Sequence, residues 1–120
     1  MKIAVTSQGP ELSSQVDPRF GRAKYFLVVE TETGEFAAHD NAQNLNAVQG
    51  AGIQAARTVV DLGVEGVVTG NVGPKAFAAL QAANVPIHTG GSGTVQEVVE
   101  RFKAGELEAT ADPTVEGHWM

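Results

Sequence analysis

Short apolar runs separated by turns dominate the first third of the chain. Residues 2–6 (KIAVT), 24–30 (KYFLVVE) and 35–40 (EFAAHD) are three such runs. Each predicts a strand, because short runs rich in β-branched and aromatic residues are typical of strands. The segment Glu32–Gly34 predicts a turn, so we expect residues 24–40 to form a hairpin whose last strand is the weaker one.

A helical spacing of apolar positions follows. We expect a first helix from about Ala47 to Leu62, ended by Gly63. Its apolar positions recur at three- and four-residue intervals: Val48, Ala51, Ala55, Val59 and Leu62.

Strands and helices then alternate to the end of the periodic pattern. Residues 65–69 and 85–88 predict strands, and residues 75–83 predict an alanine-rich helix with Pro74 at its first position. A last helix is expected from Thr94 to Lys103, because Thr94 and Glu97 have the spacing of a capping box.

This order of elements predicts one α/β domain. We expect a mixed five-stranded sheet of order 3-2-1-4-5, with the second strand antiparallel to the first, and about three helices. By analogy, this is a ribonuclease H-like architecture. The domain is expected to span residues 1–109, followed by a flexible tail over residues 110–120, which lack periodicity.

Net charge and composition exclude several classes of binding site. The 120 residues carry a formal net charge of −6 and no cysteine. The acidic balance argues against a general nucleic-acid or anionic-membrane surface, and the lack of cysteine excludes disulfides and thiolate metal sites. We expect a cytoplasmic protein, since no signal peptide or membrane span is apparent.

Three loops should meet at one edge of the sheet. Residues 7–18, 70–74 and 89–94 follow the three strands expected to be parallel, and ligands bind at that edge in open α/β sheets. Two of the loops are rich in glycine and each opens a helix, where unpaired N–H groups favour anions. An anion cradle and a simple pair of tight turns with helix caps both fit this pattern.

Basic residues gather near the same edge. Arg19, Arg22 and Lys24 precede the second strand and Lys75 opens a helix, whereas the cations Arg57, Arg101 and Lys103 are expected to serve surface solubility. His88 ends the last strand beside a glycine loop, and it suits either a structural or a ligand-binding role.

The sequence offers little support for a nucleotide-binding or catalytic motif. Neither G-x-x-x-x-G-K-[ST] nor G-x-G-x-x-G is present. No carboxylate lies on the first strand, as a two-metal nuclease would require, and no third partner joins Ser92 and His88. The remaining candidates are expected to be capping, solvated, edge or tail residues: Asp17, Asp40, Asp61, His39, His118, Trp119 and Met120.

Three segments resemble one known family. PRFGRAKYFLVV (residues 18–29), the glycine turn before the alanine-rich helix (70–79) and GGSGTVQEVVERFKAGEL (90–107) resemble the dinitrogenase iron–molybdenum cofactor biosynthesis family, the NifX-like group. The resemblance covers nearly the whole chain. Within the family, the opening residues 6–24 are most similar to the small cysteine-free orange-protein branch of sulfate-reducing bacteria.

The resemblance implies a protein that binds or carries a metal–sulfur cluster and is not an enzyme. For that branch it implies a molybdenum–copper sulfide cluster held non-covalently, with an iron–molybdenum cofactor precursor as the alternative. Such an anion supplies its own sulfurs and needs N–H donors, cations and apolar contact. The expected cofactor-binding residues are Ser7, Gln8, Arg19, Phe20, Arg22, Gly70, Asn71, Val72, Gly73, Lys75, His88, Gly90, Gly91, Ser92, Gly93 and Thr94.

A rival hypothesis is a protein-interaction module in a cofactor-assembly or ATPase-linked complex. The weak third strand, EFAAHD, would leave an edge of the sheet open to a partner.

Overall fold

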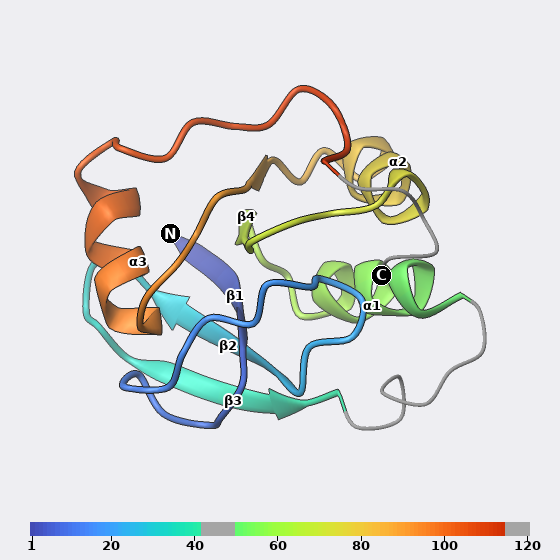
Figure 1. Cartoon of the computed structure of the whole chain (residues 1–120). Helices are drawn as coiled ribbons and strands as arrows, with labels where there is room; N and C mark the ends of the chain where they lie inside the picture. The colour runs from blue at the N-terminus through green and yellow to red at the C-terminus, as the bar shows by residue number, and fades with distance from the viewer. Residues whose placement is uncertain (42–49, 115–120) are drawn as a thin grey trace.

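The architecture was obtained as a computed structural model, which describes residues 1–41 and 50–114. Its elements follow the predicted order (Figure 1). The bounds are β1 (Lys2–Ser7), β2 (Tyr25–Glu30), β3 (Phe36–Asp40), α1 (Ala51–Asp61), β4 (Gly66–Val68), α2 (Pro74–Ala82), β5 (Ile87–His88) and α3 (Val95–Lys103). The predicted start of the first helix near Ala47 is wrong at Gly50, which is the N-cap of α1 with φ 81°, so that the helix begins at Ala51. Ala47 and Val48 lie outside the described residues.

The sheet has the predicted order β3-β2-β1-β4-β5. β1 pairs in parallel with β4, and β4 pairs in parallel with β5, while β1–β2 and β2–β3 are antiparallel. The mixed α/β topology is therefore confirmed. The ribonuclease H-like designation stays a prediction.

Side chains alternate between the two faces of a sheet. Each face has its own helices, with α3 on one side of the sheet and α1 and α2 on the other (Figure 1). On one face Ala4, Phe26 and Val67 pack with residues of α1 and α2. On the other face Ile3 and Val5 pack with residues of α3. Helices thus pack on both faces of the sheet.

The sequence signals at the helix ends are confirmed. The Thr94 hydroxyl accepts a hydrogen bond from the Glu97 amide, and the Glu97 carboxylate accepts one from the Thr94 amide, so the capping box is complete. Pro74 stands at the first position of α2. Gly63 and Gly105 have φ of +74° and +77° just beyond α1 and α3, conformations that favour glycine.

The segment after α3 returns to the sheet and covers its β5 edge. Ala109 forms a bridge with His88, and the Thr110 amide donates to the Ile87 carbonyl at 2.6 Å. Further on, the Thr114 amide donates to the Val72 carbonyl at 2.9 Å. Thr110 and Thr114 are therefore hydrogen-bonded to the body of the domain. The domain boundary at residue 109 and the flexible tail stay predictions. Across the described residues no helix is long and apolar enough to cross a membrane.

Candidate functional site

The three loops expected to meet do so through their backbones. The Phe20 amide donates to the Asn71 carbonyl at 3.2 Å, and the Gly90 amide donates to the Gly70 carbonyl at 3.0 Å. The Val16 amide donates to the Gly93 carbonyl at 2.9 Å. Loops that leave three different strands are thereby joined into one continuous surface at the carboxyl ends of β1, β4 and β5.

Glycines permit this close approach. A Cβ on Gly70 would lie 2.7 Å from the Pro18 Cα, and one on Gly21 would lie 2.9 Å from the backbone of Gly52 in α1. Both distances are shorter than real Cβ contacts allow. These glycines therefore join the loops to one another and to α1.

The first amides of α3 are bonded within the chain itself. Its first two amides, those of Val95 and Gln96, donate to the carbonyls of Ser14 and Leu12, each at 2.9 Å. The third amide, that of Glu97, donates to the Thr94 hydroxyl. Hydrogen bonds from the Thr94 amide and hydroxyl lower the pKa of the Glu97 carboxyl below its ordinary value. The expectation that this helix start offers unpaired donors is therefore wrong.

The start of α2 differs. Gly73 stands at the N-cap with extended backbone (φ −83°, ψ 170°) and provides no side chain to cap the helix. Within the described part of the chain, the amides of Lys75 and Ala76 have no acceptor, and the exposed Lys75 ammonium forms no ion pair. This helix start thus keeps donors and a cation that the protein itself does not use.

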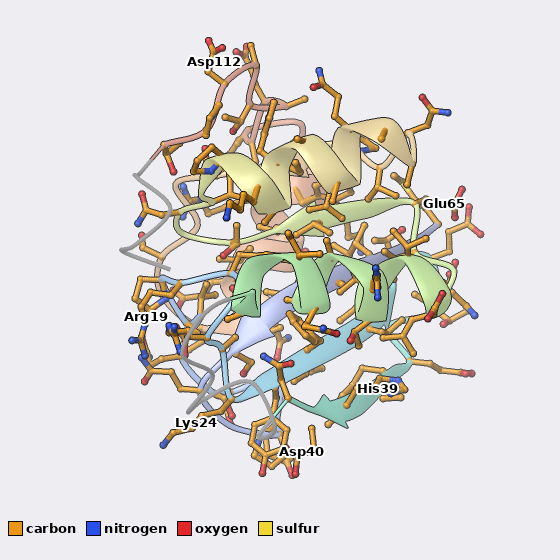
Figure 2. The ribbon with its side chains drawn as sticks, turned by 90° about the vertical axis from the view of Figure 1, so that its right-hand side faces the viewer. Arg19, Lys24, His39, Asp40, Glu65 and Asp112 are labelled. Carbon is orange, nitrogen blue, oxygen red and sulfur yellow. The ribbon has the colours of Figure 1, made fainter. Side chains whose placement is uncertain are left out.

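Arg19 lies beside this helix start. Residues Arg19 and Asn71 form a parallel bridge, and the Asn71 side chain donates to the Pro18 carbonyl at 3.4 Å. The Arg19 side chain is 43% exposed, and its Nε lies 3.9 Å from the Asp17 carboxylate. In Figure 2, α1 and α2 both begin on the side where Arg19 lies and run toward Glu65. The starts of both helices, Arg19 and the Lys75 at the start of α2 thus lie on one side of the molecule, with the Asp17 carboxylate beside Arg19.

Several expected site residues can offer only backbone atoms. Phe20 and Val72 are fully buried in the core between the sheet and helices α1 and α2, and the ring of Phe20 packs on that of Phe26. Ser7 is fully buried, and its hydroxyl donates to the Gly9 carbonyl. Gly91 is also buried, and its amide donates to the Thr69 carbonyl. A side-chain role is excluded for Phe20 and Val72.

His88 is half-buried on the α3 side of the sheet. Its Nδ1 lies 2.9 Å from the Leu107 carbonyl, and its ring makes an edge contact with Phe102 at 5.0 Å between centroids. Because a carbonyl only accepts, Nδ1 carries the proton, and Nε2 is left as the acceptor or ligand atom. These contacts fix the ring on the opposite face from the core packed against α2.

Two residues outside the expected binding set also shape the site. Asp17 is only 3% exposed, so it is not solvated. Its carboxylate instead accepts the Arg19 amide at 3.0 Å, the capping role that was the alternative. Thr114 donates its amide to Val72 and accepts the Val72 amide through its hydroxyl. An Asp two residues before Arg19 is a typical turn signal, whereas nothing local marks Thr114.

The other acidic and histidine candidates lie apart. Asp40 ends β3 and Asp61 ends α1. His39 lies on the edge strand β3, as expected, and is half-buried. His118, Trp119 and Met120 lie outside the described residues. Among the described residues, no three His, Asp or Glu side chains are grouped so as to hold a metal ion.

A family model matches residues 1–105, and its description is dinitrogenase iron-molybdenum cofactor. The chain belongs to this family. It is also similar to the orange protein of Desulfovibrio gigas, solved in its apo form, with 43% identity over 95% of this chain and 96% of that one and a TM-score of 0.92. The family resemblance drawn from the sequence is thereby confirmed.

Two further proteins are similar to this chain. A Thermotoga protein described as NifB has 38% identity over 97% of this chain and 98% of its own, with a TM-score of 0.82. An uncharacterized protein of Methanocaldococcus jannaschii is 29% identical over 90% of each chain.

Proposed function

We propose that this protein is a non-enzymatic carrier of an anionic metal–sulfur cluster in the cytoplasm. Membership of the dinitrogenase iron-molybdenum cofactor family and the likeness to the orange protein support the class of cargo. The molybdenum–copper sulfide cluster inferred for the cysteine-free branch is the proposed cargo, and an iron–molybdenum cofactor precursor is the alternative.

The observation that carries the proposal is the open start of α2. Its unbonded amides, the Lys75 ammonium and the Arg19 guanidinium provide donors and positive charge for an anion. A bare metal ion would instead need several protein ligands, and the described residues provide no such group. The arrangement therefore suits a cargo that already contains its sulfur ligands.

The proposed binding residues follow from this. Arg19, Gly73 and Lys75 would contact the anion, Arg22 would add charge, and Asn71 would hold the Arg19 loop against α2. The 89–94 loop would form a wall through its backbone.

An anaerobic titration tests the function. The apo protein is mixed with tetrathiomolybdate and Cu(I), desalted, and examined by visible absorption and metal analysis. A retained, coloured species with fixed Mo:Cu:protein stoichiometry supports the proposal. Loss of both metals on desalting, with the circular dichroism spectrum of the folded protein unchanged, contradicts the molybdenum–copper cargo.

A further inference from the structure

The two edge strands of the sheet, β5 and β3, differ in whether another segment of the chain bonds to their outer side. At β5 the outer edge is bonded by Ala109 and Thr110. β3 is the opposite edge, and it pairs only with β2 within the described residues. An open edge is a template on which another strand can pair.

The ladder between β2 and β3 shows which backbone groups point outward. The Asn41 amide donates to Lys24 at 2.9 Å, and the Glu30 amide donates to Glu35 at 2.8 Å. Hydrogen-bonded pairs alternate along an antiparallel ladder, so Ala37 and His39 also bond to β2. The N–H and C=O groups of Phe36 and Ala38 therefore face away from the sheet.

A groove of about 370 Å³ lies beside this edge. Val28, Ala37 and Leu62 line it, and Phe36, one of the exposed large apolar residues at 39%, forms part of its wall. It can therefore receive an apolar side chain from a strand added to β3.

The surroundings of the groove are acidic. Residues 25–41 contain four acids and no Lys or Arg, and Glu65 adds to the charge. Facing these are Lys2, which also lines the groove, and the Met1 ammonium, which lies 2.7 Å from Glu30. His39 lines the groove as well. The described residues provide no ion-pair partner for Glu35.

We propose that β3 docks an extended basic segment of another protein, which adds as a sixth strand. An apolar residue of that segment enters the groove, and basic residues on the same face pair with Glu35 and its acidic neighbours. A second copy of this chain fits less well, because edge-to-edge pairing would bring the acidic hairpins of both copies together. The proposal does not depend on cluster binding.

A designed peptide tests the edge. The probe is acetyl-Lys-Thr-Val-Thr-Lys-amide, whose first, third and fifth residues share one face, and its control replaces both lysines with glutamate. Both are titrated at low salt into the ¹⁵N-labelled full chain. We expect saturable shifts of the Phe36 and Ala38 amides with the basic peptide only. No saturable movement of these amides would overturn the proposal.

Variants separate edge pairing from charge. Ala38→Pro removes an outward N–H without breaking the β2 ladder and should weaken binding by ~10-fold, while Ala38→Val, which keeps the N–H, should not. Glu35→Lys should weaken binding by ~3-fold. Glu108→Lys makes the same change in charge beside the Ala109 bridge at the opposite β5 edge, and it should leave binding unchanged. The ¹⁵N spectrum of each variant alone verifies that the variant is folded.

Two outcomes would overturn the proposal at this stage. One is unchanged binding to Ala38→Pro. The other is a dimer of the wild-type chain that Ala38→Pro dissociates in light scattering, since the occupant of the edge would then be a second copy.

Discussion

The starts of α2 and α3 lie at the same edge of the sheet and look alike in sequence, yet they are used in opposite ways. At α3 the first three amides are all bonded, by Ser14, Leu12 and the Thr94 hydroxyl. At α2 the N-cap is Gly73, which has no side chain, and the following amides have no acceptor within the described residues.

The difference teaches that a glycine loop before a helix is not by itself an anion site. What matters is whether the chain uses the helix donors for its own folding. At α3 the 12–16 segment does so and fixes the loop in place. At α2 the donors remain, with Lys75 and Arg19 nearby, and this is the start that we propose as the binding site.

Reversing the charge at the open helix start should have the largest effect. Lys75→Glu should weaken cluster binding by ~30-fold, because a charge-assisted contact is replaced by repulsion. Stability should not fall, since a carboxylate in the first turn interacts favourably with the helix dipole. Retention of the molybdenum–copper species and chemical denaturation measure the two effects.

The matched control is Arg57→Glu, an exposed cation in the middle of α1 that makes the same change in net charge. It should bind almost as the wild type does. Equal losses in the two variants would mean that overall charge, and not the start of α2, determines affinity.

A side chain added at Gly70, where two loops touch, should lower the stability of the fold by nearly as much free energy as Lys75→Glu removes from binding. Gly70→Ala places a Cβ 2.7 Å from the Pro18 backbone and should destabilise the fold by about 2 kcal/mol. Gly90→Ala meets no atom but has φ +81°, and it should cost about 1 kcal/mol. Urea denaturation would contradict this account if Gly90→Ala were the more damaging change.

Removing the cap of α3 should affect stability and leave binding unchanged. Thr94→Ala loses the acceptor of the Glu97 amide and should lower the free energy of unfolding by about 1 kcal/mol. Cluster affinity should stay within error of the wild type. A parallel loss of affinity would show that the α3 loop contacts the cargo through more than its backbone.

The smallest expected effect is a pH dependence from Glu97. The pKa of this carboxyl is lowered in the fold, mainly by hydrogen bonds from Thr94, so its stabilising contribution is present above the ordinary value of 4.5. That contribution is lost as the pH falls through the lowered pKa. Glu97→Gln should therefore be less stable than wild type at neutral pH and equally stable once the pH lies well below the lowered pKa of Glu97. A difference that persists in acid would contradict this cause.

Most of the fold was predictable because its signals are local. The apolar runs gave the strands, and the spacing of Thr94 and Glu97 gave the capping box, which needs only three residues of separation. The convergence of the loops also followed, because parallel strands end at the same edge of a sheet.

Whether the first amides of each helix are hydrogen-bonded was not predictable from the sequence. That depends on contacts between residues far apart in the chain. Ser14 and Leu12 reach the α3 amides across some 80 residues of sequence. Likewise, Asp17 is buried and Phe20 turns into the core, although both belong to a polar, glycine-containing loop. Local composition carries no information on such packing.

The most direct test of the central claim is a ¹⁵N spectrum of the apo protein titrated anaerobically with tetrathiomolybdate and Cu(I). Binding at the open helix start predicts large shifts of the Gly73, Lys75 and Ala76 amides, and little movement of Val95, Gln96 and Glu97. The reverse pattern, with the α3 amides moving and those of α2 still, would contradict the account.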